Sequence, residues 1–68
     1  MNIWESYDNF RSYLLQHPPY CKGCKPPTPM VLVEEWPGKW KIEFRCTACG
    51  DRIIAEGFPG KRRIKWYR

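Results

Sequence analysis

Hydrophobic side chains near the N-terminus recur at the spacing of one helix face. The apolar positions are separated by four, three and four residues, which places them on one side of an α-helix. They are Ile3, Tyr7, Phe10 and Leu14. Asn2 is the predicted N-cap, and Glu5 follows three residues later, as in a capping box. Pro18 and Pro19 cannot continue a helix. The pattern therefore predicts a helix over residues 2–16 whose apolar stripe packs on a sheet.

Three later segments have the patterns of β-strands. Residues 30–36 are rich in β-forming side chains, and residues 40–45 alternate between apolar and charged positions. Between them, residues 36–39 (WPGK) predict a type II turn, because proline takes its second place and glycine its third. Residues 52–58 form a third predicted strand. Together these segments predict an antiparallel sheet built on a hairpin.

The C-terminus combines positive charge with apolar side chains. The last eight residues carry five basic side chains and no acidic one. Ile64 and Trp66 alternate with charged residues, which favours a fourth strand paired with the third. An unstructured basic tail is the alternative.

The chain is short but rich in aromatic residues. With 68 residues it makes one domain, and an apolar core of that size gives only marginal stability. Aromatic residues make up 16% of the chain and supply the apolar area that disordered segments lack. We therefore expect a folded domain that needs a further source of stability.

Four cysteines form the most specific chemical pattern in the chain. Cys21 and Cys24 make one Cys-x-x-Cys pair, Cys46 and Cys49 make another, and twenty-one residues separate the pairs. Structural zinc sites of this kind usually have about 15–20 residues in that interval. Two such pairs supply the four thiolates of a tetrahedral Zn²⁺ site, whose binding free energy becomes folding free energy. The sequence therefore predicts one structural Zn²⁺.

Two other uses of the cysteines fit the sequence less well. Disulfides would suit a secreted protein, but the chain starts without the charged and apolar run of a signal peptide. Redox catalysis needs one reactive pair beside a β-α-β pattern, and two pairs without that pattern are present. No apolar run is long enough to cross a membrane. We expect an intracellular protein, located in the cytoplasm, nucleoid or nucleus.

Two metal turns flanking a β-hairpin resemble a zinc ribbon. The likeness rests on CKGCK at residues 21–25 and CTACG at residues 46–50, and it extends from residue 20 to about residue 58. It implies a three-stranded antiparallel sheet with zinc held at one end by the four cysteines. Zinc ribbons occur in transcription factors, RNA polymerase subunits, ribosomal proteins, primases, topoisomerases and small adaptors. The resemblance thus implies the fold and the metal, and leaves the partner open.

The chain departs from the common ribbon pattern at both ends. It adds an N-terminal amphipathic helix and a basic aromatic C-terminus, and its hairpin tip lacks the acidic dipeptide of elongation-factor ribbons. We therefore predict a small metal-stabilised α+β fold, with the helix packed on a zinc-ribbon sheet of three strands, or four if the C-terminus joins. The expected divisions are residues 1–17 for the helix, 20–58 for the ribbon core and 59–68 for the C-terminal strand or tail.

Basic and aromatic side chains predict a binding surface. Basic groups can hold phosphates while neighbouring rings stack on bases or sugars, and exposed tryptophans also suit a protein groove. The plainer interpretation is a solvated basic end, with Trp40 and Trp66 packed on the sheet. The candidate binding residues are Trp36, Lys39, Trp40, Lys61, Arg62, Arg63, Lys65, Trp66, Tyr67 and Arg68.

The sequence predicts a binding module and not an enzyme. It contains no recognisable set of catalytic residues, and a zinc ion with four sulfur ligands has no open position for water. The first hypothesis is a transcription-associated module that binds DNA or RNA. The second is a protein-binding adaptor or inhibitor that docks on a larger machine such as RNA polymerase, through the helix and the hairpin-tip tryptophans. A purely structural subunit is the third.

Overall fold

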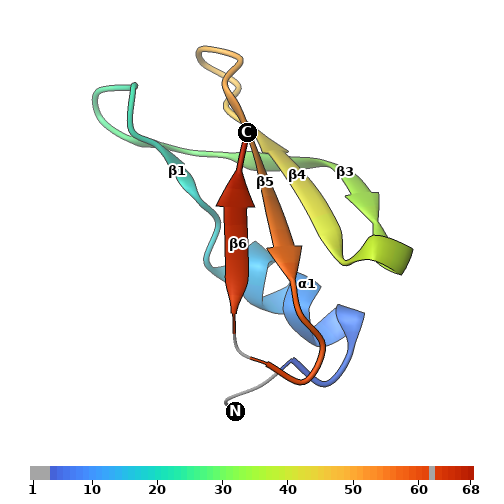
Figure 1. Cartoon of the computed structure of the whole chain (residues 1–68). Coiled ribbons are helices and arrows are strands. Elements are labelled where there is room, and N and C mark those ends of the chain that lie inside the picture. The colour runs from blue at the N-terminus through green and yellow to red at the C-terminus, as the bar shows by residue number, and fades with distance from the viewer. Residues whose placement is uncertain (1–3, 62) are drawn as a thin grey trace.

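The computed structural model describes residues 4–61 and 63–68, which form one α-helix and two antiparallel sheets (Figure 1). The helix α1 spans Tyr7–Gln16, and a 3₁₀ turn spans Pro37–Lys39. The strands are β1 (Tyr20–Cys21), β2 (Thr28–Pro29), β3 (Val31–Trp36), β4 (Lys41–Arg45), β5 (Arg52–Gly57) and β6 (Ile64–Tyr67). Strands β1 and β2 pair with each other, and the larger sheet has the order β3-β4-β5-β6. No helix in these residues is long and apolar enough to span a membrane.

The helix starts later than the sequence pattern predicts. It begins at Tyr7, and Ser6 is its N-cap, since the Ser6 hydroxyl accepts a hydrogen bond from the Asn9 amide at 3.2 Å. The expected cap, Asn2, lies outside the described residues, and the capping-box role for Glu5 is wrong because Glu5 precedes the helix. The helix ends at Gln16, as the prolines predict.

The apolar stripe of α1 packs on one face of the large sheet. Phe10 and Leu14 are fully buried there. Phe10 stacks on the Trp40 ring at a centroid distance of 5.6 Å and meets the edge of Trp4 at 5.8 Å. The Trp4 indole nitrogen also donates a hydrogen bond to the backbone carbonyl of Arg63. The sheet contributes Ile42, Phe44 and Ala55 to the same core. This face of the sheet is therefore covered by α1, as the sequence pattern predicts.

The hairpin tip differs from the expected type II turn. Residues 37–39 form a 3₁₀ turn, and the left-handed backbone falls on Trp40, with φ of 53°, instead of on Gly38. A bulky residue in that region is strained by about 1–3 kcal/mol. Packing of the Trp40 ring against α1 offsets that strain. Strand β4 consequently begins at Lys41, one residue after the predicted start.

The basic C-terminal segment forms strand β6. It pairs antiparallel with β5, with Trp66 opposite Ala55 and Tyr67 opposite Ile54. Because successive side chains of a strand point to opposite faces, Trp66 lies on the helix side of the sheet and Tyr67 on the other.

Gly57 allows the helix to approach β5 closely. A Cβ atom at this position would lie 2.7 Å from Cε1 of Phe10. Such a distance is too short for a stable contact, so the Phe10 ring occupies the space that the Cβ atom of any other residue at position 57 would need.

Gly57→Ala is therefore expected to destabilise the fold by about 1–3 kcal/mol, because the added methyl overpacks the core. Gly38→Ala is the matched control, since a Cβ there meets no atom within 4 Å. Urea unfolding of the metal-loaded variants measures both effects. Equal stability of Gly57→Ala and the wild type would mean that α1 does not press on β5.

A polar contact also joins α1 to the sheet. The Tyr7 hydroxyl donates to the Glu35 carboxylate at 2.8 Å, and Arg11 pairs with the same oxygen at 2.8 Å. Burial and the contact with Glu35 raise the pKa of Tyr7. The hydrogen bond from Tyr7, followed by that from Arg11, lowers the pKa of Glu35 against the opposing effect of burial. The pair is thus held as neutral phenol and charged carboxylate.

Tyr7→Phe is expected to lower the free energy of unfolding by about 1 kcal/mol at neutral pH, because it removes a partly solvent-screened hydrogen bond to a charged group. The stabilisation by Tyr7 is complete below the pKa of an unfolded tyrosine, about 10, and decreases as the pH rises above it. The difference in the free energy of unfolding between the wild type and Tyr7→Phe should therefore become smaller in alkaline buffer. The exposed Tyr20, changed to Phe, is the control. A difference that stays constant with pH would contradict the assignment.

Candidate metal centre and the open face of the sheet

The four cysteines come together at one end of the sheet. Cys21 ends β1 and Cys24 follows in the next turn, while Cys46 and Cys49 lie in the connection from β4 to β5. All four sulfur atoms lie within 4.8 Å of one another. Cys21 and Cys46 are buried, Cys24 is half-buried and Cys49 is exposed. The cluster therefore joins two hairpins that are far apart in the sequence.

The sulfur spacing fits one tetrahedral metal ion. With metal–sulfur bonds of about 2.3 Å, two sulfurs of a tetrahedral site are about 3.8 Å apart. The sulfur of Cys21 lies 3.4 Å from that of Cys49 and 3.7 Å from that of Cys24. Cys24 and Cys46 are 3.6 Å apart. A disulfide bond is about 2.05 Å long, and all four cysteines are free. The cluster is thus arranged to hold a metal ion, and the short sulfur–sulfur distances are close to the edges of such a tetrahedron.

The backbone of the second metal turn favours the ionised form of Cys46, which is the form that binds a cation. The Gly50 amide donates to the Cys46 carbonyl at 2.8 Å, and Gly50 has φ of 78°, which glycine adopts without strain. The backbone amides of Cys49 and then Ala48 lower the pKa of Cys46 to about 7, although burial opposes them. Hydrogen bonding to Cys46 and Cys21, together with burial, raises the pKa of Cys24 to about 12. One thiol ionises readily, and ionisation of all four requires a cation between them.

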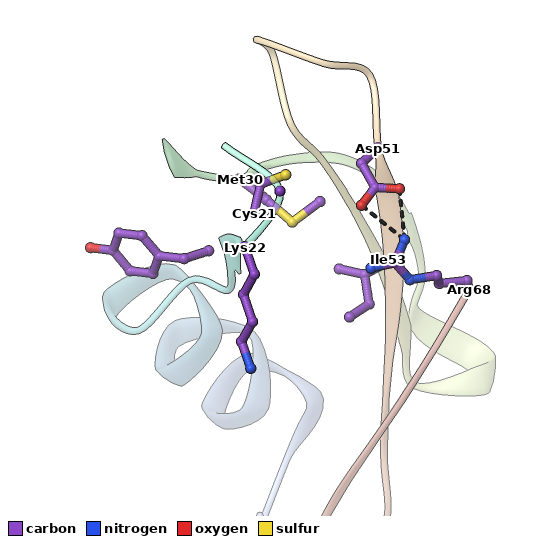
Figure 2. Close-up of a pocket in the computed structure, with 8 residues that line it drawn as sticks. Cys21, Lys22, Met30, Asp51, Ile53 and Arg68 are labelled. Atoms are coloured by element: carbon purple, nitrogen blue, oxygen red, sulfur yellow. Dashed lines mark hydrogen bonds and ion pairs between the residues drawn. The ribbon is translucent and has the colours of Figure 1, made fainter. Parts of the chain in front are cut away.

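A hollow of about 200 Å³ lies beside the first metal turn (Figure 2). Figure 2 shows Cys21 and Met30 on one side of it and Asp51 with Arg68 on the other. The Arg68 guanidinium donates to both Asp51 carboxylate oxygens, at 2.8 and 2.9 Å. Arg68, one of the predicted binding residues, is therefore engaged with Asp51 in an exposed ion pair, which stabilises the fold little.

The face of the large sheet opposite α1 carries the other predicted residues. The pairing of the strands places Trp36, Lys41, Glu56 and Lys65 in one row across this face. The next row contains Glu34, Glu43, Ile54 and Tyr67. We call this surface the open face, because α1 packs on the other side.

A hollow of about 200 Å³ on the open face is lined by Trp36, Lys39, Lys41, Ile54 and Tyr67. The ammonium groups of Lys41 and Lys65 each lie 5.7 Å from the centre of the Tyr67 ring, a cation–π distance. Hydrogen bonding to Tyr67, followed by the charges of Tyr67 and Glu56, raises the pKa of Lys41 against the effect of desolvation. Positive charge and aromatic surface therefore adjoin each other here.

The predicted binding residues divide between several places. Trp36, Lys39, Lys65 and Tyr67 gather around the open face. Trp40 is turned to the helix, and Trp66 lies on the helix side of edge strand β6 with 40% of its surface exposed. Lys61 and Arg63 are exposed in the turn before β6. Arg62 lies outside the described residues.

Sequence reasoning missed Lys41 and Ile54, which complete the hollow on the open face. The alternation of residues 40–45 places Lys41 on the other face of the sheet from Trp40, so the sequence does indicate which face Lys41 occupies. Its neighbours on that face depend on the register between β4, β5 and β6, which the alternation of one strand does not give.

Comparisons with family models, with curated proteins and with solved structures found no match for this chain. Its function is therefore inferred from the geometry of the metal centre and of the open face.

We expect the protein to bind one equivalent of Co²⁺, with the visible absorption of thiolate coordination, and to lose that spectrum in Cys46→Ala. Affinity should fall as the pH is lowered, because the thiols must be deprotonated to bind metal. Met30→Leu is the control, since Met30 is a buried sulfur residue beside Cys21 but not a member of the cluster. Full binding by Cys46→Ala would contradict the four-sulfur site.

Proposed function

We propose that this chain is a zinc ribbon, in which Cys21, Cys24, Cys46 and Cys49 hold one structural Zn²⁺, and that it is a non-enzymatic nucleic-acid-binding module. Four thiolates complete the tetrahedral shell of zinc, which leaves no position for a reacting water. The role of the ion is then to hold the two metal turns together. The binding free energy of such an ion, about 10–16 kcal/mol, exceeds what a small core supplies.

The observation that carries the nucleic-acid proposal is the pairing of β6 with β5. It brings Lys65, from the basic C-terminal segment, onto the same face as Lys39 and Lys41 near the hairpin tip. Two separate basic regions of the sequence thereby form one positive area. Release of counterions from a phosphate backbone favours binding to such an area.

The acidic residues of this region are partly neutralised. Glu43 pairs with Arg52 at 3.3 Å, and Asp51 pairs with Arg68 at 2.8 Å. Arginines therefore take up these two carboxylates, and Glu56 is the acidic residue that lies beside Lys41 and Lys65.

Fluorescence anisotropy with labelled single-stranded DNA, duplex DNA and RNA, at about 50 and 200 mM salt, tests this function. We expect binding that weakens steeply with salt. The double variant Lys39→Gln with Lys65→Gln should reduce the salt slope by about one for each lysine that pairs with a phosphate in the wild type. The double variant Lys22→Gln with Lys25→Gln, which removes two charges from the first metal turn, is the matched control and should bind as the wild type does. Absence of binding to all three probes at low salt would overturn the proposal.

A protein-binding adaptor is the second candidate. The observation in its favour is the exposed apolar surface of Leu15 on the helix and of Val31 and Val33 on the edge strand β3. An edge strand offers unpaired backbone groups to a partner. Under this function, binding would be insensitive to salt and would be lost in Trp36→Ala.

A further inference from the structure

The hollow on the open face has two aromatic walls and an apolar floor. Trp36 ends β3 and Tyr67 lies on β6, the two edge strands of the sheet. Two strands separate these edges, so the backbones of β3 and β6 are about 14 Å apart. Ile54 from β5 and the stem of Lys41 from β4 lie between them. The side chains of all four strands therefore enclose one shallow site.

The rim of this site carries cations. Lys39 lines it, and the ammonium groups of Lys41 and Lys65 lie 5.7 Å from the Tyr67 ring centre. Glu56 lies between Lys41 and Lys65 in one row, and Lys39 lies in the adjoining 3₁₀ turn, so one carboxylate adjoins three lysines there. The matching ligand has a flat, apolar ring attached to a negatively charged group.

A nucleotide within a single strand has that chemistry. Its base offers a ring face for stacking, and the adjoining phosphates offer charge to the lysines. In a duplex the bases are stacked on one another and their faces are hidden, whereas unpaired bases can stack on aromatic side chains displayed by a sheet. The geometry of the hollow thus favours an unpaired base over a duplex.

We infer that the open face binds single-stranded nucleic acid, with one base stacked in the hollow between Trp36 and Tyr67 and the flanking phosphates held by Lys39, Lys41 and Lys65. This inference rests on the proposed nucleic-acid-binding function and specifies its ligand. Tyr67 supplies the ring on the cationic side of the hollow, and Trp36 closes the opposite side.

The test compares two labelled oligonucleotides of equal length and charge, one of deoxythymidine and one that is abasic at every position. The zinc-loaded protein is measured by fluorescence anisotropy at about 50 mM salt. We expect the base-bearing strand to bind about 5- to 150-fold more tightly than the abasic strand, the contribution of one stacked base. A duplex of the same length should bind more weakly than the base-bearing strand.

Substitutions of the two aromatic walls test whether the base stacks in the hollow. Tyr67→Leu should lose the preference for the base-bearing strand but keep salt-dependent binding, and Tyr67→Phe, which retains a ring, should keep the preference. Tyr20→Leu is the matched control, because Tyr20 is an exposed tyrosine on β1, away from the hollow. One bound Co²⁺ per chain shows that each variant is folded. If Tyr67→Leu fails that check, Trp36→Leu removes the opposite wall and carries the same expectation.

The possible outcomes separate the two claims. Equal binding of the base-bearing and abasic strands, with steep salt dependence, would overturn base stacking and leave the proposed function standing. A preference that survives in both Tyr67→Leu and Trp36→Leu, or tighter binding of the duplex, would also overturn it. Absence of binding to every probe would overturn the proposed function as well.

Discussion

The convergence of four thiols at one end of the sheet is the constraint on which the rest of the fold depends. It joins the short β1–β2 hairpin to the β4–β5 connection. Sulfur atoms this close cannot all carry charge without a cation between them. A metal ion bound there would fix where the chain leaves β2 for β3, and with it the position of α1 against the sheet.

Aromatic packing then distinguishes the two faces of the sheet. On the helix side, the Phe10 ring packs against the rings of Trp4 and Trp40. Gly57 lets the Phe10 ring approach the backbone of β5. That packing fills one face and leaves the other without a covering element among the described residues (Figure 1). The open face keeps aromatic and cationic side chains together, because the strand register that builds the core also sets its opposite side.

Most of the local structure could be predicted from the sequence, and most of the long-range placement could not. Periodicity located the helix and strands β3 to β6, and cysteine spacing located the cysteine cluster, because both signals are local. The short strands β1 and β2 were not predicted, since two residues are too few to show an alternation. The helix start was wrong because a serine four residues later provides the cap. The predicted turn type was wrong because packing of Trp40 on the helix overrides the preference of Gly38 for the left-handed backbone. The neighbours of Tyr67 depend on register between strands, which single-strand patterns do not contain.

Under the proposed function, a metal ion at the cysteine cluster and the helix on one side leave the opposite face of the sheet free to bind nucleic acid. Amide chemical shifts of the zinc-loaded protein, titrated with a short single-stranded oligonucleotide, test it most directly. We expect the shift changes to concentrate at Trp36, Lys41, Ile54 and Tyr67 and to leave the amides of α1 unchanged. Shift changes that concentrate on α1, or at the metal turns without the open face, would contradict it.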